Sequence, residues 1–379
     1  MRIAFFSESF LPYVSGVTIA VDTLANDLRK LGHEVTIFAP SYPNQPNKEK
    51  DVVRFPSIPS SYPGFRLALR LFLTTHIPSF GKQNEFDIIH IHSPFQLGRL
   101  GRRIAKKYNI PLVLTLHTLF DQYLHNLPVL PKYATRPLLM RYLKRFYKSC
   151  NCIIIPSQRV AEEMKVVGRV EIITNGIAFE EIEKSKLIET RSKLGIPKDA
   201  KVLLYMGRLS KEKNLPFLFE VFQKLSAEFN NLYFLVIGGG PLEKQLRTSH
   251  LEHRTIIFTG QTPREQLFQY AKAADVFIFS STTETQGLVI AEAKACGLPV
   301  VTVDDPAIRA SVINNEDGFL VNENVDDFSA KVKLLLQDNT LREKMGRVAK
   351  ENAQRDFSSI AVAKKHEAVY NSLIKGGIK

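Results

Sequence analysis

The feature that most restricts the fold of this chain is an alternation of short apolar runs with amphipathic stretches. Runs rich in β-branched and aromatic residues occur at 3–7, 34–39, 87–92, 112–117 and 152–156. Between them lie helical patterns, such as 17–31, which Gly32 ends at a C-cap position, and 97–108. Strands that alternate with helices predict right-handed βαβ units and a parallel sheet covered by helices on both faces.

The same alternation of apolar runs and amphipathic stretches begins again after the turn dipeptide Asn175-Gly176. The second set of predicted strands is 201–206, 233–237, 255–258, 276–280 and 299–303. The charged stretch 180–197 is expected to be helical or connecting. A length of 379 residues suits two domains of ordinary size. We therefore expect two doubly wound α/β domains that face each other across a cleft, where such folds bind ligands.

Composition excludes several protein classes. The hydrophobic fraction of 44% and the charged fraction of 23% are typical of a folded globular protein. No apolar run reaches the roughly 18–20 residues of a membrane span. Glu8 interrupts the first apolar run, so we interpret it as a buried strand rather than a signal peptide. Cys150, Cys152 and Cys296 fit neither a disulfide framework nor a zinc site, which indicates a reducing compartment such as the cytoplasm.

Positive charge is concentrated in the first half of the chain. Of the net charge of +13, residues 1–175 carry +11. Between Asp87 and Glu162 there are twelve basic residues and a single acid, Asp121. This asymmetry predicts an anionic partner, which charge alone leaves open among membrane phosphates, nucleic acid and an acidic substrate. Because no DNA- or RNA-binding module is recognisable, we expect no nucleic-acid partner.

Glycine-containing and basic loops follow three of the predicted strands. Ser15-Gly16 opens a helix after the first strand, where backbone N–H groups can meet an anion, although a simple turn is an equal interpretation. The loop GRLSKEKN (207–214) places Arg208 and Lys213 at the end of a strand. A guanidinium fork and an ammonium point charge can clamp a diphosphate, but the loop also fits a solvated basic turn. Gly238–Gly240 has the same placement and the same ambiguity.

The string SSTTETQGLVIAEA (280–293) carries the most specific signal. It leaves a predicted strand and enters a helix near Leu288. Glu284 is expected in the loop, and Glu292 lies about one turn into the helix, where a carboxylate can accept hydrogen bonds from a vicinal diol. Free N–H groups near Gly287 and Leu288 can face a phosphate.

Glu284-x7-Glu292, followed by AKACGLPV (293–300), resembles the signature of retaining glycosyltransferases of family 4, which have the GT-B fold. The loop 207–214 and the opening Ser15-Gly16 match that family as well, so the resemblance covers nearly the whole chain. It implies an α/β protein of two facing Rossmann-like domains that close on the donor. The N-terminal, acceptor- and membrane-side domain would comprise 1–175 plus 362–379, and 176–361 would bind the nucleotide-sugar.

Residue roles follow from this resemblance. Arg208 and Lys213 would bind the donor diphosphate, Glu292 the ribose hydroxyls and Glu284 the transferred sugar. Phe258–Gln261 matches the region whose backbone reads the base. The implied donor site is Ser15, Gly16, Arg208, Lys213, Gly239, Gln261, Thr285, Gln286, Gly287, Leu288 and Glu292. His117 matches the histidine that contacts the donor sugar, whereas His90 and His92 are interpreted as structural.

HTLFDQY (117–123) and ETQG (284–287) are similar to bacterial diacylglycerol glucosyltransferases. This similarity implies transfer of glucose from UDP-glucose to diacylglycerol, with Asp121 positioning or deprotonating the acceptor hydroxyl or serving as an ordinary surface carboxylate. Other acceptors stay open: a phosphatidylinositol mannosyl- or sulfoquinovosyl-type lipid enzyme, or a transferase for a soluble acceptor. A non-catalytic sugar-nucleotide sensor is a further alternative. The presence of all four charged site residues disfavours it: Arg208, Lys213, Glu284 and Glu292.

The resemblance also implies how the reaction runs. Family members generally lack a placed protein nucleophile, and the leaving phosphate guides the acceptor to the same face of the sugar. No Asp-x-Asp motif is present, and Asp304-Asp305 is expected to form a turn. We therefore expect no metal and no cofactor.

A basic amphipathic pattern at 132–148 predicts docking on an anionic membrane at the cytoplasmic face. At 100° per residue, one helix face gathers Leu138, Leu139, Tyr142, Leu143 and Phe146. The opposite face gathers Arg141, Lys144, Arg145 and Lys148. Arg66 and Arg70 would add a second contact. The alternative is an ordinary domain helix whose basic face meets water.

Overall fold

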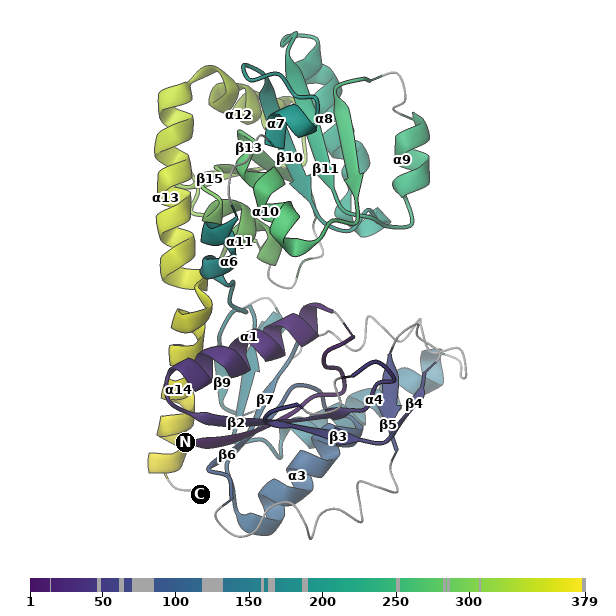
Figure 1. The fold of residues 1–379 in the computed structure, drawn as a ribbon, viewed down its shortest axis with the longest axis vertical. Helices are drawn as coiled ribbons and strands as arrows, with labels where there is room; N and C mark the ends of the chain where they lie inside the picture. Colours follow the sequence, from purple (N-terminus) through teal and green to yellow (C-terminus); the bar gives the residue numbers. More distant parts are fainter. Residues whose placement is uncertain are drawn as a thin grey trace. The chain divides into compact units, whose positions relative to one another are not determined.

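The computed structural model describes the chain except for certain residues: 14, 46–48, 61–64, 70–84, 118–131, 158–159, 163–167, 186–189, 250–252, 282–283, 285–286, 307, 377–379, and the side chains of 132–136. The chain forms two compact units (Figure 1). Unit 1 comprises Met1–Gly176 and Ser359–Lys379, and unit 2 comprises Ile177–Ser358. The return to unit 1 comes three residues earlier than the sequence suggested, because a new helix starts at Ser359.

Unit 1 is built on a parallel sheet with the strand order β3-β2-β1-β6-β7-β8-β9. Its strands are β1 (Arg2–Phe6), β2 (Glu34–Pro40), β3 (Val52–Phe55), β6 (Ile88–Ile91), β7 (Leu112–Thr115), β8 (Cys152–Ile155) and β9 (Val170–Ile172). A separate antiparallel hairpin consists of β4 (Ser57–Pro59) and β5 (Arg66–Ala68). The order reverses between β1 and β6, and ligands of such sheets bind at the strand carboxyl ends near this point.

Helices cover both faces of this sheet. They are α1 (Gly16–Lys30), α3 (Gln96–Tyr108), α4 (Lys132–Tyr147) and α14 (Ser359–Lys375). Because successive side chains of a strand point to opposite faces, Phe5 packs in the core under α1 and α14, and Phe6 packs in the core under α3 and α4. Helices α1 and α14 lie side by side, although they come from opposite ends of the chain (Figure 1).

Unit 2 has a parallel sheet of order β12-β11-β10-β13-β14-β15. Its strands are β10 (Lys201–Met206), β11 (Leu232–Ile237), β12 (Ile256–Gly260), β13 (Val276–Phe279), β14 (Val300–Val303) and β15 (Gly318–Val321). Its helices are α6 (Phe179–Lys184), α7 (Thr190–Lys193), α8 (Leu215–Ser226), α9 (Glu243–Ser249), α10 (Arg264–Lys272), α11 (Leu288–Ala295), α12 (Val325–Gln337) and α13 (Asn339–Phe357). The order reverses between β10 and β13, which makes these two strands neighbours.

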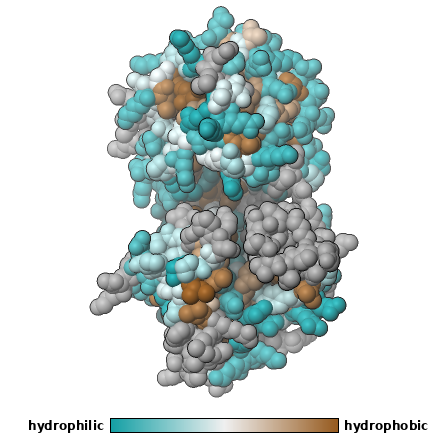
Figure 2. All heavy atoms as spheres, turned by 90° about the vertical axis from the view of Figure 1, so that its right-hand side faces the viewer, coloured by the Kyte–Doolittle hydropathy of each residue, from teal (hydrophilic) through white to brown (hydrophobic). Residues whose placement is uncertain are grey.

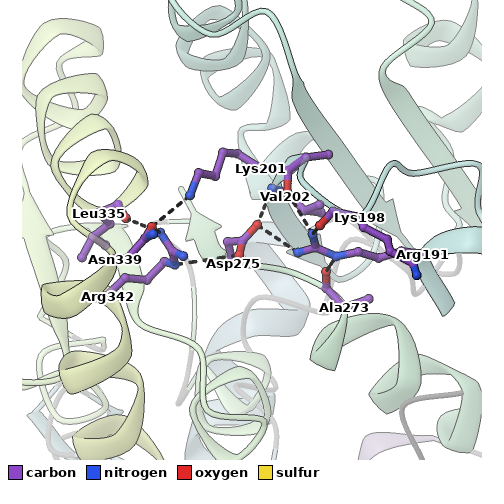
Figure 3. A network of polar contacts seen from close by, with 10 residues as sticks. Arg191, Lys198, Lys201, Val202, Ala273, Asp275, Leu335, Asn339 and Arg342 are labelled. Atoms are coloured by element: carbon purple, nitrogen blue, oxygen red, sulfur yellow. Dashed lines mark hydrogen bonds and ion pairs between the residues drawn. The ribbon is translucent and has the colours of Figure 1, made fainter. Parts of the chain in front are cut away.

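A polar network holds the amino ends of the unit 2 strands together (Figure 3). Asp275, just before β13, accepts hydrogen bonds from the backbone N–H of Val202 at 2.8 Å and from Arg191 Nη2 at 3.1 Å. The Arg342 guanidinium on α13 lies 3.8 Å from the same carboxylate. The network joins the connecting helix α7, the two central strands and α13. It lies at the amino ends of the strands, whereas ligands of doubly wound folds bind at the carboxyl ends.

Candidate active site

Two loops interlock at the carboxyl ends of β10 and β11. The backbone N–H of Leu209 donates to Gly239 O at 3.0 Å, and Leu242 N donates to Leu209 O at 3.0 Å. Gly238 has a φ of +133°, and a Cβ there would lie 1.9 Å from Gly207 O, so only glycine allows the loops to approach this closely. Arg208 lies in this paired loop, and its side chain is exposed.

Lys213 and Glu284 form an ion pair beyond the ends of β10 and β13. Both side chains are largely buried, with 19% and 15% of their surfaces exposed. Ser280 fixes the approach, since its Oγ donates to Lys213 O at 2.9 Å and to Asn214 O at 3.0 Å. Two residues that the sequence places 71 positions apart thus share one polar site because their strands are adjacent in the sheet.

Glu292 lies on α11 and is 9% exposed. Its Oε1 accepts a hydrogen bond from Arg264 Nη1 at 2.9 Å, and Arg264 Nε donates to Glu181 Oε2 at 2.7 Å. Burial raises the pKa of Glu292 above its usual value, and the Arg264 guanidinium opposes this rise. Gly287, with a φ of +67°, is the N-cap of α11, and Leu288 is the first residue of the helix.

Gly239 and Gln261 lie close together at the ends of β11 and β12. A Cβ added to Gly239 would lie 3.6 Å from Gln261 N and 3.4 Å from Glu243 Oε2. Arg247 Nε donates to Glu243 Oε1 at 3.0 Å, which holds this carboxylate beside the two glycine-containing strand ends. Glu243 is a polar residue of this edge that the sequence did not single out.

In unit 1, Ser15 is the N-cap of α1. Its Oγ accepts a hydrogen bond from Thr18 N at 3.2 Å, so this side chain satisfies one of the free N–H groups of the helix. Gly16 is the first residue of the helix, and a Cβ built on it would have no heavy atom within 4 Å. The N-terminus of α1 is therefore open to a group that approaches its backbone.

His117 follows β7 and borders a pocket of about 20 Å³ that lies within unit 1. His92, Thr115, Thr174 and His366 also line this pocket. His117 Nε2 and His92 Nδ1 are 3.0 Å apart and share a hydrogen bond, and the planes of the two rings are inclined by 24°. Burial lowers the pKa of His117 to about 4, so the imidazole is neutral at pH 7.

A carboxylate at the end of β1 is also buried. Glu8 is 5% exposed, and its Oε1 accepts from Leu97 N at 2.5 Å, at the start of α3. Its Oε2 has no hydrogen-bond partner among the described residues. Desolvation therefore raises the pKa of Glu8 to about 7.

Comparison with known proteins identifies this arrangement. Residues 14–181 match the model "Glycosyltransferase Family 4", and residues 188–352 match "Glycosyl transferases group 1". The chain is 34% identical to an alpha-monoglucosyldiacylglycerol synthase of Acholeplasma laidlawii, with 99% of this chain and 98% of the relative covered. A synthase of the same name from Streptococcus pneumoniae is 33% identical over 93% of this chain and 83% of its own length. The chain belongs to glycosyltransferase family 4.

Solved structures agree on the fold of this glycosyltransferase. Sucrose-phosphate synthase from Thermosynechococcus elongatus superposes with a TM-score of 0.76 at 22% identity, and 99% of each chain is covered. HepE from Anabaena, determined with UDP and glucose, gives a TM-score of 0.72 at 20% identity over 98% of this chain and 100% of its own. The expected GT-B fold with two Rossmann-like domains is confirmed.

Most of the predicted site residues of the family 4 enzyme lie at the carboxyl ends of the strands of their own unit. The structure brings Lys213 to Glu284 and Gly239 to Gln261, and it places Gly287, Leu288 and Glu292 on α11. Asp121, Thr285, Gln286 and Arg70 lie outside the described residues. Sequence reasoning missed Arg264 as the partner of Glu292. It interpreted His92 as structural, and the structure adds that His92 shares a hydrogen bond with His117.

Among the described residues, no group of three or more His, Cys, Asp or Glu side chains is arranged to hold a metal ion. Asp304, a residue of the Asp304-Asp305 pair, accepts hydrogen bonds from Arg309 Nε at 2.7 Å and from Nη2 at 2.9 Å. Its charge is therefore paired locally.

Helix α4 of the glycosyltransferase and the residue that follows it present a basic surface, defined here as the exposed side chains of Arg141, Lys144, Arg145 and Lys148. Its inner face packs Leu143 and Phe146 into the core. Leu138 does not join this inner face as expected, because it lies at the border of the apolar stripe and is 65% exposed. Arg66 is used within its hairpin, where Nε and Nη2 donate to Ser57 Oγ and Ser57 O.

Proposed function

We propose that this protein is a retaining glucosyltransferase that transfers glucose from UDP-glucose to diacylglycerol at the cytoplasmic face of a membrane. The observation that carries the proposal is the identity of 33–34% with two alpha-monoglucosyldiacylglycerol synthases, over nearly the whole chain in one case. Phosphatidyl-myo-inositol mannosyltransferase and a sulfoquinovosyl transferase, at 27–28% identity, are more distant lipid-modifying relatives.

The donor-binding part of the proposal rests on the carboxyl edge of unit 2. Arg208 and Lys213 offset the negative charge of the diphosphate, which grows as the bond to the sugar breaks. Glu292 accepts hydrogen bonds from the ribose hydroxyls, and the base lies near Gly239 and Gln261. The HepE structures with UDP and UDP-glucose support a uridine nucleotide. This clamp needs no metal and no cofactor.

In the proposed reaction the acceptor hydroxyl oxygen attacks the anomeric carbon on the face from which the diphosphate leaves. The C–O bond to the diphosphate breaks, a new C–O bond forms with the same configuration, and the hydroxyl proton passes to the leaving phosphate. Glu284 and His117 orient the glucosyl group, and Asp121 positions the acceptor hydroxyl. The protein contributes mainly orientation and charge stabilisation. Orientation alone can lower a barrier by on the order of 7–11 kcal/mol.

The membrane part of the proposal rests on the basic surface of α4. Each basic residue near an anionic leaflet contributes on the order of 1 kcal/mol, so four residues hold a protein reversibly. Leu138 beside this surface is 65% exposed, and Ile58 and Leu67, which face each other on the β4–β5 hairpin, are 49% and 41% exposed. On the face shown in Figure 2, small hydrophobic patches lie within a mostly hydrophilic described surface. Within the described part of the chain, no helix is both long and apolar enough to cross a bilayer.

A turnover assay tests the proposal. The protein is incubated with UDP-glucose, UDP-galactose, GDP-mannose or UDP-sulfoquinovose, each with vesicles that contain diacylglycerol, phosphatidylinositol or neither. We expect a glucolipid from UDP-glucose and diacylglycerol, with the α configuration in the NMR spectrum and unchanged rates in EDTA. A product with mannose or sulfoquinovose would replace the glucosyl assignment with that of the other lipid relatives. Transfer only to a soluble acceptor would remove the lipid assignment.

A further inference from the structure

Three buried histidines, His90, His92 and His366, and the half-buried His117 lie together on the α1 and α14 side of the unit 1 sheet. His90 and His92 are two residues apart on and just beyond β6, so they point to the same face. His90 bridges two hydroxyl groups, with Nδ1 2.7 Å from Tyr370 Oη and Nε2 2.7 Å from Thr115 Oγ1. His366 Nδ1 donates to Val362 O at 2.9 Å. Of these three, His92 shares a hydrogen bond with His117.

All four imidazoles are neutral at pH 7. Burial lowers the pKa of His90 and His92 well below the usual value, and the pKa of His117 and His366 falls to about 4. A neutral imidazole has one N–H donor and one acceptor nitrogen, and the bond that one nitrogen makes decides the role of the other. The hydrogen bond between His92 and His117 therefore sets the donor and acceptor positions of both rings.

The hydrogen bond between His92 and His117 can run in either direction, and the burial of His92 Nε2 distinguishes the two arrangements. This atom is sealed from solvent and has no hydrogen-bond partner among the described residues. If His117 Nε2–H donated to His92 Nδ1, His92 would carry its proton on Nε2, where it would meet no acceptor. A buried N–H without an acceptor is rarer in proteins than an acceptor without a donor. The favoured arrangement has the His92 proton on Nδ1 and a lone pair on the sealed Nε2.

We propose that His92 is a positioning residue, whose Nδ1–H donates to His117 Nε2 and thereby holds His117 as the tautomer with its proton on Nδ1. His117 then presents a fixed N–H donor beside the pocket and no acceptor. Such a group recognises an oxygen lone pair of the substrate. The catalytic part of this inference rests on the proposed function, which places His117 against the donor sugar, whereas the tautomer does not depend on it.

Nuclear magnetic resonance of the full chain tests the tautomer directly. The nine histidines are labelled with nitrogen-15, and His117→Gln and His92→Asn identify the two spin systems by their loss. We expect a protonated Nδ1 and an unprotonated Nε2 for His117, unchanged between pH 6 and 8. The opposite pattern, or an averaged mixture of both tautomers in the unmodified protein, would overturn the inference.

Kinetics test the positioning role. His92→Phe keeps a ring of similar size but cannot donate, so kcat/KM should fall about tenfold, the loss expected for one hydrogen bond. His92→Asn places an amide N–H near the Nδ1 position and should recover most of this loss. His90→Phe is the matched control, because His90 lies next to His92 on the same face, is equally buried, and makes its hydrogen bonds with Tyr370 and Thr115 rather than with His117. It should leave the His117 spectrum unchanged.

A double-mutant cycle separates positioning from a structural effect. If His92 acts through His117, His92→Phe should have little further effect on kcat/KM in a His117→Phe background. An undiminished tenfold loss in that background would show that His92 acts elsewhere. Full activity of His117→Phe would instead contradict the sugar contact in the proposed function. The tautomer of His117 would then still be decided by the nuclear magnetic resonance spectra. If His92→Phe does not fold, the unmodified protein and His92→Asn still decide the tautomer.

Discussion

Arg264 Nη1 donates a hydrogen bond to Glu292 Oε1 over 2.9 Å and so opposes the rise in the pKa that burial causes in this carboxyl group. The two residues lie on α10 and α11, and Arg264 also binds Glu181. Burial alone would favour the neutral acid, which could not offer two acceptor oxygens to a ribose diol. Arg264 thus supports the proposed ribose contact without being part of it.

Replacement of this arginine should make nucleotide binding depend on pH. In Arg264→Gln the pKa of Glu292 rises further, so the carboxyl gains a proton as the pH falls. We expect the Kd for UDP, measured by calorimetry, to rise at least about fivefold at pH 8, because the Glu292 carboxylate loses the hydrogen bond that holds it for the ribose. The Kd should rise further at pH 6, because more of the carboxyl group is then protonated. Glu181→Gln is the control, because it leaves the Arg264 charge in place. Equal affinities at both pH values would contradict this account.

The two glutamates should affect different steps. Glu292→Gln removes an acceptor for the ribose and should weaken UDP binding. Glu284→Gln releases Lys213 from its ion pair, so UDP should bind as tightly as before or tighter, while kcat falls because the sugar loses a contact. Calorimetry with UDP and steady-state kinetics measure the two effects. Unimpaired UDP affinity in Glu292→Gln would rule out the ribose contact.

Arg208→Ala should lower kcat/KM by at least about tenfold, since a hydrogen bond to a charged group contributes about 1.5–3 kcal/mol. Its fold should persist, because the side chain is exposed and the loop is held by backbone groups, including Arg208 O, which accepts from Tyr205 Oη at 3.0 Å. A melting curve checks the fold, and full activity at an unchanged Tm would remove Arg208 from the donor site.

The central strands, and the placement of several site residues just after them, could be predicted from the sequence. The central strands are continuous apolar runs, and the Rossmann strand order makes β10 and β13 neighbours, which explains why Lys213 meets Glu284. The edge strands β3, β9 and β15 were missed, because they are short and two of them, β3 and β9, are largely half-exposed. Nothing in the local pattern distinguishes them from connecting segments.

The support of the site was harder to predict. Arg264 begins a helix with the sequence REQLF, where an arginine ordinarily meets solvent, and only the packing of α10 against α11 brings it to Glu292. His92 left a detectable signal, because the spacing His90-x-His92 places both rings on one face. The contact with His117 still required the register of β6 against β7, which the sequence does not state.

Neutralisation of the basic surface should weaken membrane docking. We expect the combined change of Arg141, Lys144, Arg145 and Lys148 to Gln to reduce sedimentation with anionic vesicles and to leave UDP binding unchanged. Binding of the unmodified protein should fall with added salt. The control removes the same charge from unit 2, through Gln at the exposed residues Arg254, Lys344, Arg347 and Lys350. Equal losses in both variants would mean that net charge, not this surface, drives binding.

Glu8 should make the stability of the protein depend on pH. Its pKa rises on folding from 4.5 to about 7, so its protonated form is favoured in the folded state. The resulting stability is fully present below about pH 4.5 and is lost as the pH rises through about 7, a change of about 3 kcal/mol. Glu8→Gln should remove this part of the pH dependence in urea unfolding between pH 4.5 and 8. Parallel curves for the variant and the unmodified protein would contradict the assignment.

The division of the chain has a consequence for its synthesis on the ribosome. Unit 2 is one continuous segment, Ile177–Ser358, whereas unit 1 is interrupted by it. Tyr370 on α14 provides the hydroxyl for His90 on β6, 280 residues earlier. During translation, unit 2 can complete its core while unit 1, the first to be made, still lacks one helix of its own. Unit 1 is therefore the first to emerge from the ribosome and the last to complete its fold. A truncation before α14 should destabilise unit 1, which is made first, rather than unit 2.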